Sequence, residues 1–300
     1  MSCANRFGCI QRADLSRRDP AQRTKRSSGL GFSWAIGVAL GIVGEAGCTI
    51  PTDAEWLPPN DRAPFAVVAS SLPVDPASPD ARQPLNPTIQ IRFSDFPDPV
   101  TVTFPTLRLG PRGQSIQYTY DLSLVDKQLT LRPRGHLLPE TDYLVDIDSG
   151  LRSLAGQPLA PAFELRFHTG SDVLPVPPPP APVTLATLVA DGSPLRKSCA
   201  FAGCHSSTAS EPVRGLDFAA APAILRQQLV GAPRAGIDRL LIVEAGRPET
   251  SYLLRKLLAR TSDGYLRIEG EPMPPPGSSP APIDLDTLRA IESWIRDGAN

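Results

Sequence analysis

The sequence lacks an excess of charge of either sign. Its 300 residues include 30 lysines and arginines and 31 aspartates and glutamates, so composition gives no reason to expect nucleic acid as a partner. Methionine is also scarce, since Met273 is the only one besides Met1. Proline is abundant by contrast. The 35 prolines are about twice the usual share of ~5%, which favours loops, linkers and β-structure over a helical bundle.

The five cysteines fall into three groups along the chain. Two lie near the start, one ends a hydrophobic stretch, and two form a local pair: Cys3 and Cys9, Cys48, and Cys199 with Cys204. Neighbouring thiols do not stay idle in an oxidising compartment. If the start of the chain is exported and removed, the local pair therefore requires a chemical explanation.

The start of the chain has the three parts of an export signal. Residues 6–26 are rich in arginine and lysine, residues 27–44 carry no charge, and small residues lead up to Cys48. A basic region, an apolar region and a small-residue site are typical of a secretory signal. We therefore predict a signal peptide over residues 1–47.

The ending Ala46-Gly47-Cys48 resembles a bacterial lipobox. The resemblance implies that Cys48 is acylated and anchors an exported protein to the membrane on the outer-membrane or periplasmic side of the cell envelope. The alternative is an uncleaved signal anchor, because the uncharged run is close to the ~20 residues that span a membrane. Either interpretation exports the rest of the chain.

After a polar, proline-rich tether at 48–63, the pattern changes to short runs of period two. Apolar and polar residues alternate in the expected strands at 65–69, 89–93, 107–109, 116–122, 129–131, 143–147 and 163–167. Turn-forming segments separate several of these runs. Seven short strands between 64 and 170 predict a Greek-key β-sandwich.

Four stretches of this region resemble the bacterial Ig-like domains of S-layer and envelope proteins. They are Leu129–Pro133, Leu138–Tyr143, Gly150–Gly156 and Phe167–Gly170. The residues that match are structural, namely a corner tyrosine, turn glycines and core apolar residues. The resemblance implies a spacer or adhesion module rather than a catalytic one, and we expect His136 and His168 to be ordinary loop and strand-end residues.

A proline-rich linker at 171–183 precedes a change to helical periodicity. The run Pro177–Pro180 favours an extended polyproline II conformation. Apolar spacing then predicts helices around Leu185–Leu195, Ala223–Gln228, Tyr252–Leu257 and Leu288–Ile295. The last helix is expected to be capped near Asp284 or Asp286 and to stop at Gly298. A helical domain this short has little hydrophobic core of its own unless a bound group completes it.

The segment from Cys199 to His205 contains the residues of this region that are suited to binding a cofactor. Its Cys-x4-Cys-His pattern is related to Cys-x2-Cys-His, the signature of c-type haem attachment. In that signature the two thiols form thioethers with the haem vinyl groups and the histidine ligates the iron. Four residues here separate Cys199 from Cys204, so a bulged loop is required, which Gly203 permits.

A second iron ligand is expected from Met273, because residues 184–300 contain no histidine besides His205. The haem motif, Arg247–Leu257, Met273-Pro274-Pro275 and Ile291–Ala299 follow in an order that resembles class I c-type cytochrome domains. The resemblance covers about residues 184–300. It implies one covalent haem c, attached at Cys199 and Cys204 with His205 and Met273 as axial ligands, and a terminal helix whose Trp294 packs on the first helix.

Other interpretations of the same residues stay open. Cys199 and Cys204 could instead form a local disulfide, and Met273 could be an ordinary core residue. Zinc would find only three ligands here. A thiol–disulfide oxidoreductase normally has two residues between its cysteines rather than four.

The sequence therefore predicts a multidomain protein, an N-terminal all-β Ig-like sandwich plus a C-terminal mostly-α cytochrome c-like domain. We expect single-electron transfer with a protein redox partner rather than an enzymatic reaction, because a His/Met-ligated iron has no open position. The alternative is a non-redox structural or adhesion lipoprotein of the envelope, with a Cys199–Cys204 disulfide and no haem.

Overall fold

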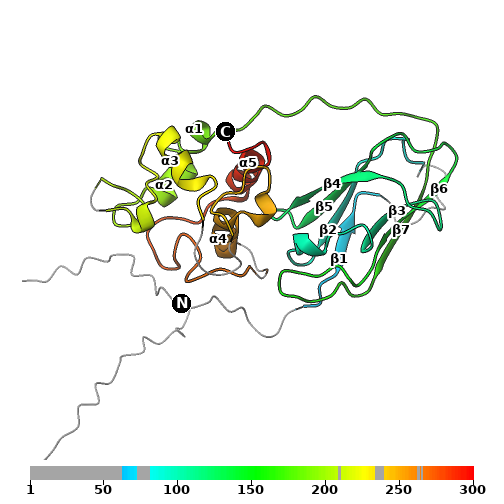
Figure 1. The fold of residues 1–300 in the computed structure, drawn as a ribbon, viewed down its shortest axis with the longest axis horizontal. Helices are drawn as coiled ribbons and strands as arrows, with labels where there is room; N and C mark the ends of the chain where they lie inside the picture. The colour runs from blue at the N-terminus through cyan, green and yellow to red at the C-terminus, as the bar shows by residue number, and fades with distance from the viewer. Residues whose placement is uncertain (1–62, 73–81, 209–210, 234–239, 262–263, 265) are drawn as a thin grey trace, which may run out of the picture. The chain divides into compact units, whose positions relative to one another are not determined.

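The computed structural model describes residues 63–300 except 73–81, 209–210, 234–239, 262–263 and 265 (Figure 1). The predicted signal peptide, the tether and Cys48 lie outside the described residues, so their assignment stays a prediction. Among the helices that are described, none combines the length and the apolar character needed to cross a bilayer.

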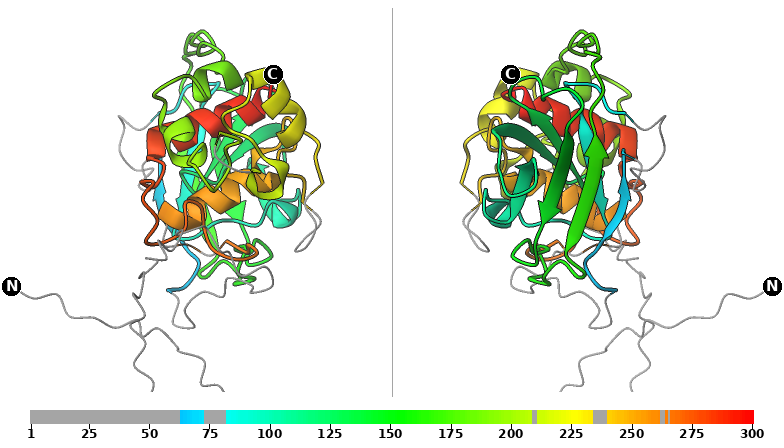
Figure 2. Two further views of the ribbon diagram at one scale, coloured as in Figure 1. Left: turned by 90° about the vertical axis from the view of Figure 1, so that its left-hand side faces the viewer. Right: turned by 90° about the vertical axis from the view of Figure 1, so that its right-hand side faces the viewer.

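The first half of the described chain forms two antiparallel sheets. One has the order β1-β2-β5-β4 and the other the order β3-β6-β7. The strands of the described part are β1 (Val67–Ser70), β2 (Ile89–Phe93), β3 (Leu107–Gly110), β4 (Tyr118–Ser123), β5 (Gln128–Pro133), β6 (Asp142–Ile147) and β7 (Phe163–His168). The right-hand view of Figure 2 faces these strands. The predicted β-sandwich is confirmed.

Alternation of apolar and polar residues explains why the sandwich forms. Along β2, Ile89, Ile91 and Phe93 are buried while the residues between them are exposed. Buried apolar residues of neighbouring strands lie opposite each other, since Ile89 pairs with Leu131 in β5. One face of each sheet is thus apolar, and burying the two faces together removes both from water.

Tyr143 lies at one corner of the sandwich, where the resemblance to Ig-like domains predicts a corner tyrosine. Its ring is buried and stacks on Phe167, with ring centroids 5.6 Å apart. Its hydroxyl accepts a hydrogen bond from the backbone N–H of Leu138 at 3.0 Å. A tyrosine that bonds the backbone a few residues upstream is the corner found in Ig-type sandwiches.

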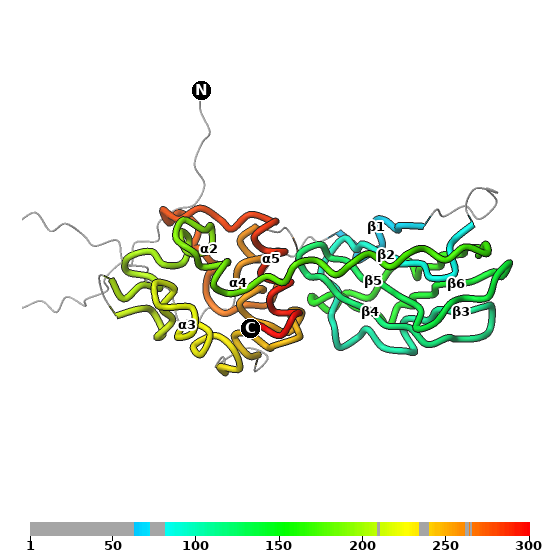
Figure 3. The backbone as a smooth tube through the Cα atoms, turned by 90° about the horizontal axis from the view of Figure 1, so that it is seen from above, coloured from blue at the N-terminus to red at the C-terminus, as the bar shows by residue number. Residues whose placement is uncertain are grey.

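The linker at 171–183 is exposed and has no regular secondary structure. It runs as an extended segment from the end of β7 to the first helix (Figures 1 and 3). Asn86 ties its beginning to the sandwich, because this side chain donates to Leu174 O at 2.8 Å and accepts from Leu174 N at 2.9 Å. The prolines that follow keep the segment extended.

Short helices joined by long loops make up the rest of the chain. They are α1 (Leu185–Leu188), α2 (Pro194–Cys199), α3 (Pro222–Leu229), α4 (Tyr252–Thr261) and α5 (Leu285–Arg296), with 3-10 turns η2 (Pro99–Thr101) in the sandwich and η3 (Val213–Gly215) and η5 (Pro248–Thr250) among the helices. The left-hand view of Figure 2 faces them.

The expected first helix differs from what the structure shows. It is divided into α1 and α2, and the break falls at Gly192, whose φ of +82° lies in the left-handed region. Ser193 then caps α2 by accepting from Arg196 N at 3.2 Å, and Pro194 occupies its first position. The prediction of one helix was wrong because it used apolar spacing alone. The stop at Gly192 and the start at Ser193-Pro194 were not taken into account.

The last helix follows its predicted boundaries closely. Asp284 is the N-cap of α5 and accepts from Thr287 N at 2.8 Å, while Gly298 follows its end with a φ of +97°. Trp294 is fully buried in a cluster that includes Leu185 and Leu188 of α1. The expected packing of α5 against the first helix is therefore seen.

Residues of the sandwich also contribute to the core around the helices. Phe96, Leu124 and Val125 are buried in the same cluster as Trp294. Beside them, Glu292 of α5 is only 3% exposed. Its carboxylate accepts from Ser123 Oγ at 2.7 Å, from Leu124 N at 2.8 Å and from Val125 N at 3.4 Å. The turn after β4 is thus bonded directly to the last helix.

Candidate functional site

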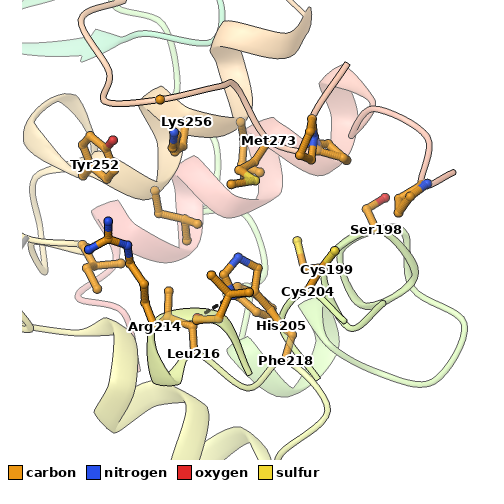
Figure 4. Close-up of a pocket in the computed structure, with 18 of the residues that line it drawn as sticks. Ser198, Cys199, Cys204, His205, Arg214, Leu216, Phe218, Tyr252, Lys256 and Met273 are labelled. Carbon is orange, nitrogen blue, oxygen red and sulfur yellow. Dashed lines mark hydrogen bonds between the residues drawn. The ribbon is translucent and has the colours of Figure 1, made fainter. Parts of the chain in front are cut away.

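A cavity of about 330 Å³ lies among the helices and contains the four predicted haem-binding residues. Cys199, Cys204, His205 and Met273 all line it (Figure 4). Much of the remaining lining is apolar: Leu216, Phe218, Ile242, Leu253 and Leu257. A volume of this size and an apolar lining with a few polar groups are typical of small-molecule and cofactor sites.

The two cysteines reach the cavity from a helix end and from the turn that follows. Cys199 is the last residue of α2. The chain then reverses, with Cys204 N donating to Phe201 O at 3.0 Å. Gly203 has a φ of +82°, a conformation that other residues rarely adopt. The four-residue spacing is therefore accommodated by one extra turn at a glycine.

His205 follows directly and presents one ring nitrogen to the cavity. Its Nδ1 lies 3.1 Å from the carbonyl oxygen of Val213. A carbonyl only accepts, so Nδ1 carries the proton and Nε2 keeps its lone pair. Burial lowers the pKa of His205, the backbone hydrogen bonds to Val213 and Leu216 partly offset this, and the nearby charge of Lys256 lowers it further. The imidazole is thus neutral and oriented as a metal ligand requires.

Met273 lies on the opposite side of the cavity from His205, and both side chains point into it (Figure 4). It is half-buried, between the buried Pro272 and Pro274. Its backbone N–H donates to Lys256 O at 3.0 Å. The thioether therefore comes from a segment that is packed on both sides and bonded to α4.

The cysteines are thiols in this structure, and burial determines the chemistry of the first. Desolvation, with a smaller contribution from Cys204, raises the pKa of Cys199 to about 12. A thiol that stays protonated at neutral pH is a poor nucleophile for disulfide exchange. This argues against a thiol–disulfide oxidoreductase at the site.

The cavity is also lined by polar residues that were not predicted as site residues, namely Tyr252, Lys256, Arg214, Ser198 and Glu269. Tyr252 and Lys256 lie one turn apart on α4, and residues four apart share one face of a helix. A lysine on an apolar helix face was the signal that could have found it. Arg214 has a φ of +56° within η3, for which the sequence contains no signal.

The remaining candidate residues lie elsewhere. His136 is exposed in a loop. His168 ends β7, where its Nδ1 lies 2.8 Å from Asp142 and its Nε2 3.4 Å from Glu140. Within the described residues, no three or more histidine, cysteine, aspartate or glutamate side chains form a group suited to a metal ion.

Comparison with known proteins identifies the sandwich. Residues 61–169 match the family model described as a bacterial Ig-like domain. This part of the chain is therefore a bacterial Ig-like domain. No curated protein matches the sequence.

Several solved structures align with about a third or more of the chain. The N-terminal part of the bacterial S-layer protein SbsC is 16% identical, over 41% of this chain and 26% of that one, with a TM-score of 0.27. Native alpha-2-macroglobulin from Escherichia coli, in a structure spanning domains MG0-NIE-MG1, is 19% identical over 36% and 32%, with a TM-score of 0.28. L,D-transpeptidase 1 from Mycobacterium tuberculosis is 15% identical over 35% and 38%, with a TM-score of 0.24.

Proposed function

We propose that residues 184–300 form a cytochrome c-like domain that binds one haem c covalently and transfers single electrons to and from a protein partner. The observation that carries this proposal is the convergence of His205 and Met273 on opposite sides of one cavity, with Cys199 and Cys204 beside them. These residues are up to 74 positions apart (273 − 199). A disulfide-bonded cap would not need the histidine or the methionine there.

The residues that line the cavity fit a covalently bound haem c. Cys199 and Cys204 would hold it as thioethers, and His205 Nε2 and the Met273 sulfur would ligate its iron. Bound haem supplies a reversible one-electron couple, which histidine and methionine ligands place at a raised potential. His205 and Met273 would both be engaged with the group and would leave no position for a substrate, so the proposal is an electron carrier and not an enzyme.

In this proposal the Ig-like domain is the spacer between the membrane and the haem domain. Export by residues 1–47, acylation of Cys48 and a place in the cell envelope belong to the same proposal. They rest on the composition of the start of the chain and agree with a family of bacterial Ig-like domains.

A second candidate is a non-redox structural or adhesion protein of the envelope, in which Cys199 and Cys204 form a disulfide. The match of residues 61–169 to a bacterial Ig-like domain favours this candidate, because the resemblance implies a spacer or adhesion module. A pyridine haemochrome spectrum of the chain, exported in a host with c-type maturation machinery, separates the two. Haem that survives acid–acetone extraction supports the carrier. A colourless protein with a Cys199–Cys204 disulfide by mass spectrometry refutes it.

A further inference from the structure

The segment that presents Met273 is almost without hydrogen-bond donors of its own. Of residues 272–276, four are prolines, so Met273 has the only backbone N–H. That N–H donates to Lys256 O at 3.0 Å. The segment therefore has one backbone donor through which the rest of the protein can hold it, and that donor is bonded to α4.

Lys256 supplies two further bonds to the residues just before Met273. Its ammonium group donates to the carbonyl oxygens of Glu269 and Glu271. Hydrogen bonds from a charged donor are about twice as strong as neutral ones. One residue thus bonds the Met273 loop at three points, through its backbone oxygen and through its side chain.

Tyr252, one turn earlier on α4, holds the same loop. Its hydroxyl accepts from Glu269 N at 3.0 Å. Residues four apart share one face of a helix, and here both Tyr252 and Lys256 line the cavity. Tyr252 and Lys256 therefore lie beside each other on the cavity face of α4 (Figure 4), and both are hydrogen-bonded to Glu269.

We propose that Lys256 is a positioning residue that fixes the Met273 thioether in place as an iron ligand. This inference rests on the proposed function, because it concerns the strength of the methionine–iron bond. With the ammonium removed, the loop keeps its prolines and the Met273 N–H bond but loses its charged anchor at Glu269 and Glu271. The thioether then moves away from the iron more often, and an added ligand competes more easily for its place.

The test compares Lys256→Gln, which removes the charge, with Lys256→Arg, which keeps the charge and the donors. Lys197→Gln is the matched control, since Lys197 is exposed on α2 near the same cysteines. Each full-length chain is matured in the periplasm. The measurements are covalent haem per chain, the weak long-wavelength absorption band of a methionine bound to ferric iron, and the affinity for added imidazole.

We expect Lys256→Gln to keep its covalent haem, to lose most of the long-wavelength band and to bind imidazole about tenfold more tightly, a change that corresponds to about 1.4 kcal/mol. Lys256→Arg and Lys197→Gln should resemble wild type. An unchanged band and imidazole affinity in Lys256→Gln would overturn the inference, and so would an Arg variant that loses as much as the Gln variant.

Two further outcomes are distinguishable. A wild-type chain without covalent haem refutes the proposed function, and the role of Lys256 as an anchor for an iron ligand is refuted with it. If Lys256→Gln does not fold, Tyr252→Phe removes only the hydroxyl that accepts from Glu269 N. We expect the same changes in that variant at smaller amplitude, and wild-type values there would overturn the inference.

Discussion

Glu292 in α5 accepts a hydrogen bond at 2.8 Å from the backbone N–H of Leu124, 168 residues earlier in the chain. The same carboxylate accepts from Ser123 Oγ, and Arg296 lies 3.3 Å from it. A buried N–H that loses its acceptor costs the full desolvation of that group. This bond therefore links the turn after β4 to the last helix through a buried group that needs its acceptor.

Replacing Glu292 tests that dependence. Glu292→Ala leaves the buried N–H of Leu124 unsatisfied and should lower the free energy of unfolding by ~1–3 kcal/mol. Glu292→Gln keeps one carbonyl oxygen and should lose less. Urea unfolding of the full chain measures both, with the exposed Glu211→Ala as control. Equal stabilities of Glu292→Ala and wild type would show that the bond is dispensable.

The same residue predicts a pH dependence. Burial raises the pKa of Glu292 above its ordinary value of about 4.5, and the bonds from Ser123 and Arg296 only partly offset this. The folded protein therefore holds this proton more tightly than the unfolded chain does. The advantage of wild type over Glu292→Gln should be fully present below about pH 4.5 and decline as pH rises through the raised pKa. An advantage that grows over this range would contradict the assignment.

The ion pair beside this contact should matter much less. Arg289 and Asp126 lie 2.8 Å apart, but their side chains are 47% and 33% exposed. Solvent screening limits such pairs to ~0.2–1 kcal/mol. A double-mutant cycle of Asp126→Asn with Arg289→Gln should give a coupling in that range that shrinks with added salt. A larger, salt-independent coupling would mean that the pair is buried in solution.

Gly203 should be needed for the spacing of the two cysteines. Its φ of +82° is strained for any other residue, although a Cβ there would meet no neighbour. Gly203→Ala should therefore cost ~1–2 kcal/mol through the backbone alone and lower the yield of covalent haem. Gly135→Ala is the matched control, because its site is equally open and has no such φ. Similar thermal unfolding and haem yield in both variants would contradict the role of this turn.

If residues 184–300 bind haem c as proposed, Met273→Ala should leave the haem covalent, because the proposed thioethers do not involve it, but remove the long-wavelength band and lower the reduction potential. Spectroelectrochemical titration measures both effects. The exposed Pro276→Ala is a suitable control in the same segment. A variant that retains the band at full strength would exclude Met273 as the ligand.

The proposed export and acylation can be tested at Cys48. Cys48→Ser should abolish incorporation of labelled palmitate and leave unprocessed precursor in the membrane, because the thiol is the acceptor of the lipid. Cys9→Ser, upstream of the predicted cleavage site, should have no effect. Labelling of the Cys48→Ser variant at the wild-type level would disprove the lipoprotein assignment.

Local patterns made much of the fold predictable. Alternation at Ile89, Ile91 and Phe93 identified a strand, and Asp284 with Gly298 bounded the last helix, because these signals arise within a few residues. The break at Gly192 was missed since apolar spacing continues across it. The convergence of His205 and Met273 followed from a resemblance and not from any local pattern.

Contacts between distant segments could not be predicted. Phe96 lies in a turn-rich segment that has no periodicity, and Glu292 has the sequence character of an exposed helical residue. Only the folded chain shows that both are buried. Lys256 differs, because its position on an apolar helix face was visible, but its bonds to Glu269 and Glu271 depend on a loop whose path the sequence does not specify.

The separation of Leu124 and Glu292 along the chain also implies a delay during synthesis. A ribosome adds about 5–20 residues per second, so the 168 residues that separate this pair take on the order of ten seconds to synthesise. Throughout that interval Ser123 Oγ and Leu124 N lack the acceptor that Glu292 provides, since α5 does not yet exist. We therefore expect the newly made chain to be prone to aggregation until its last helix has emerged.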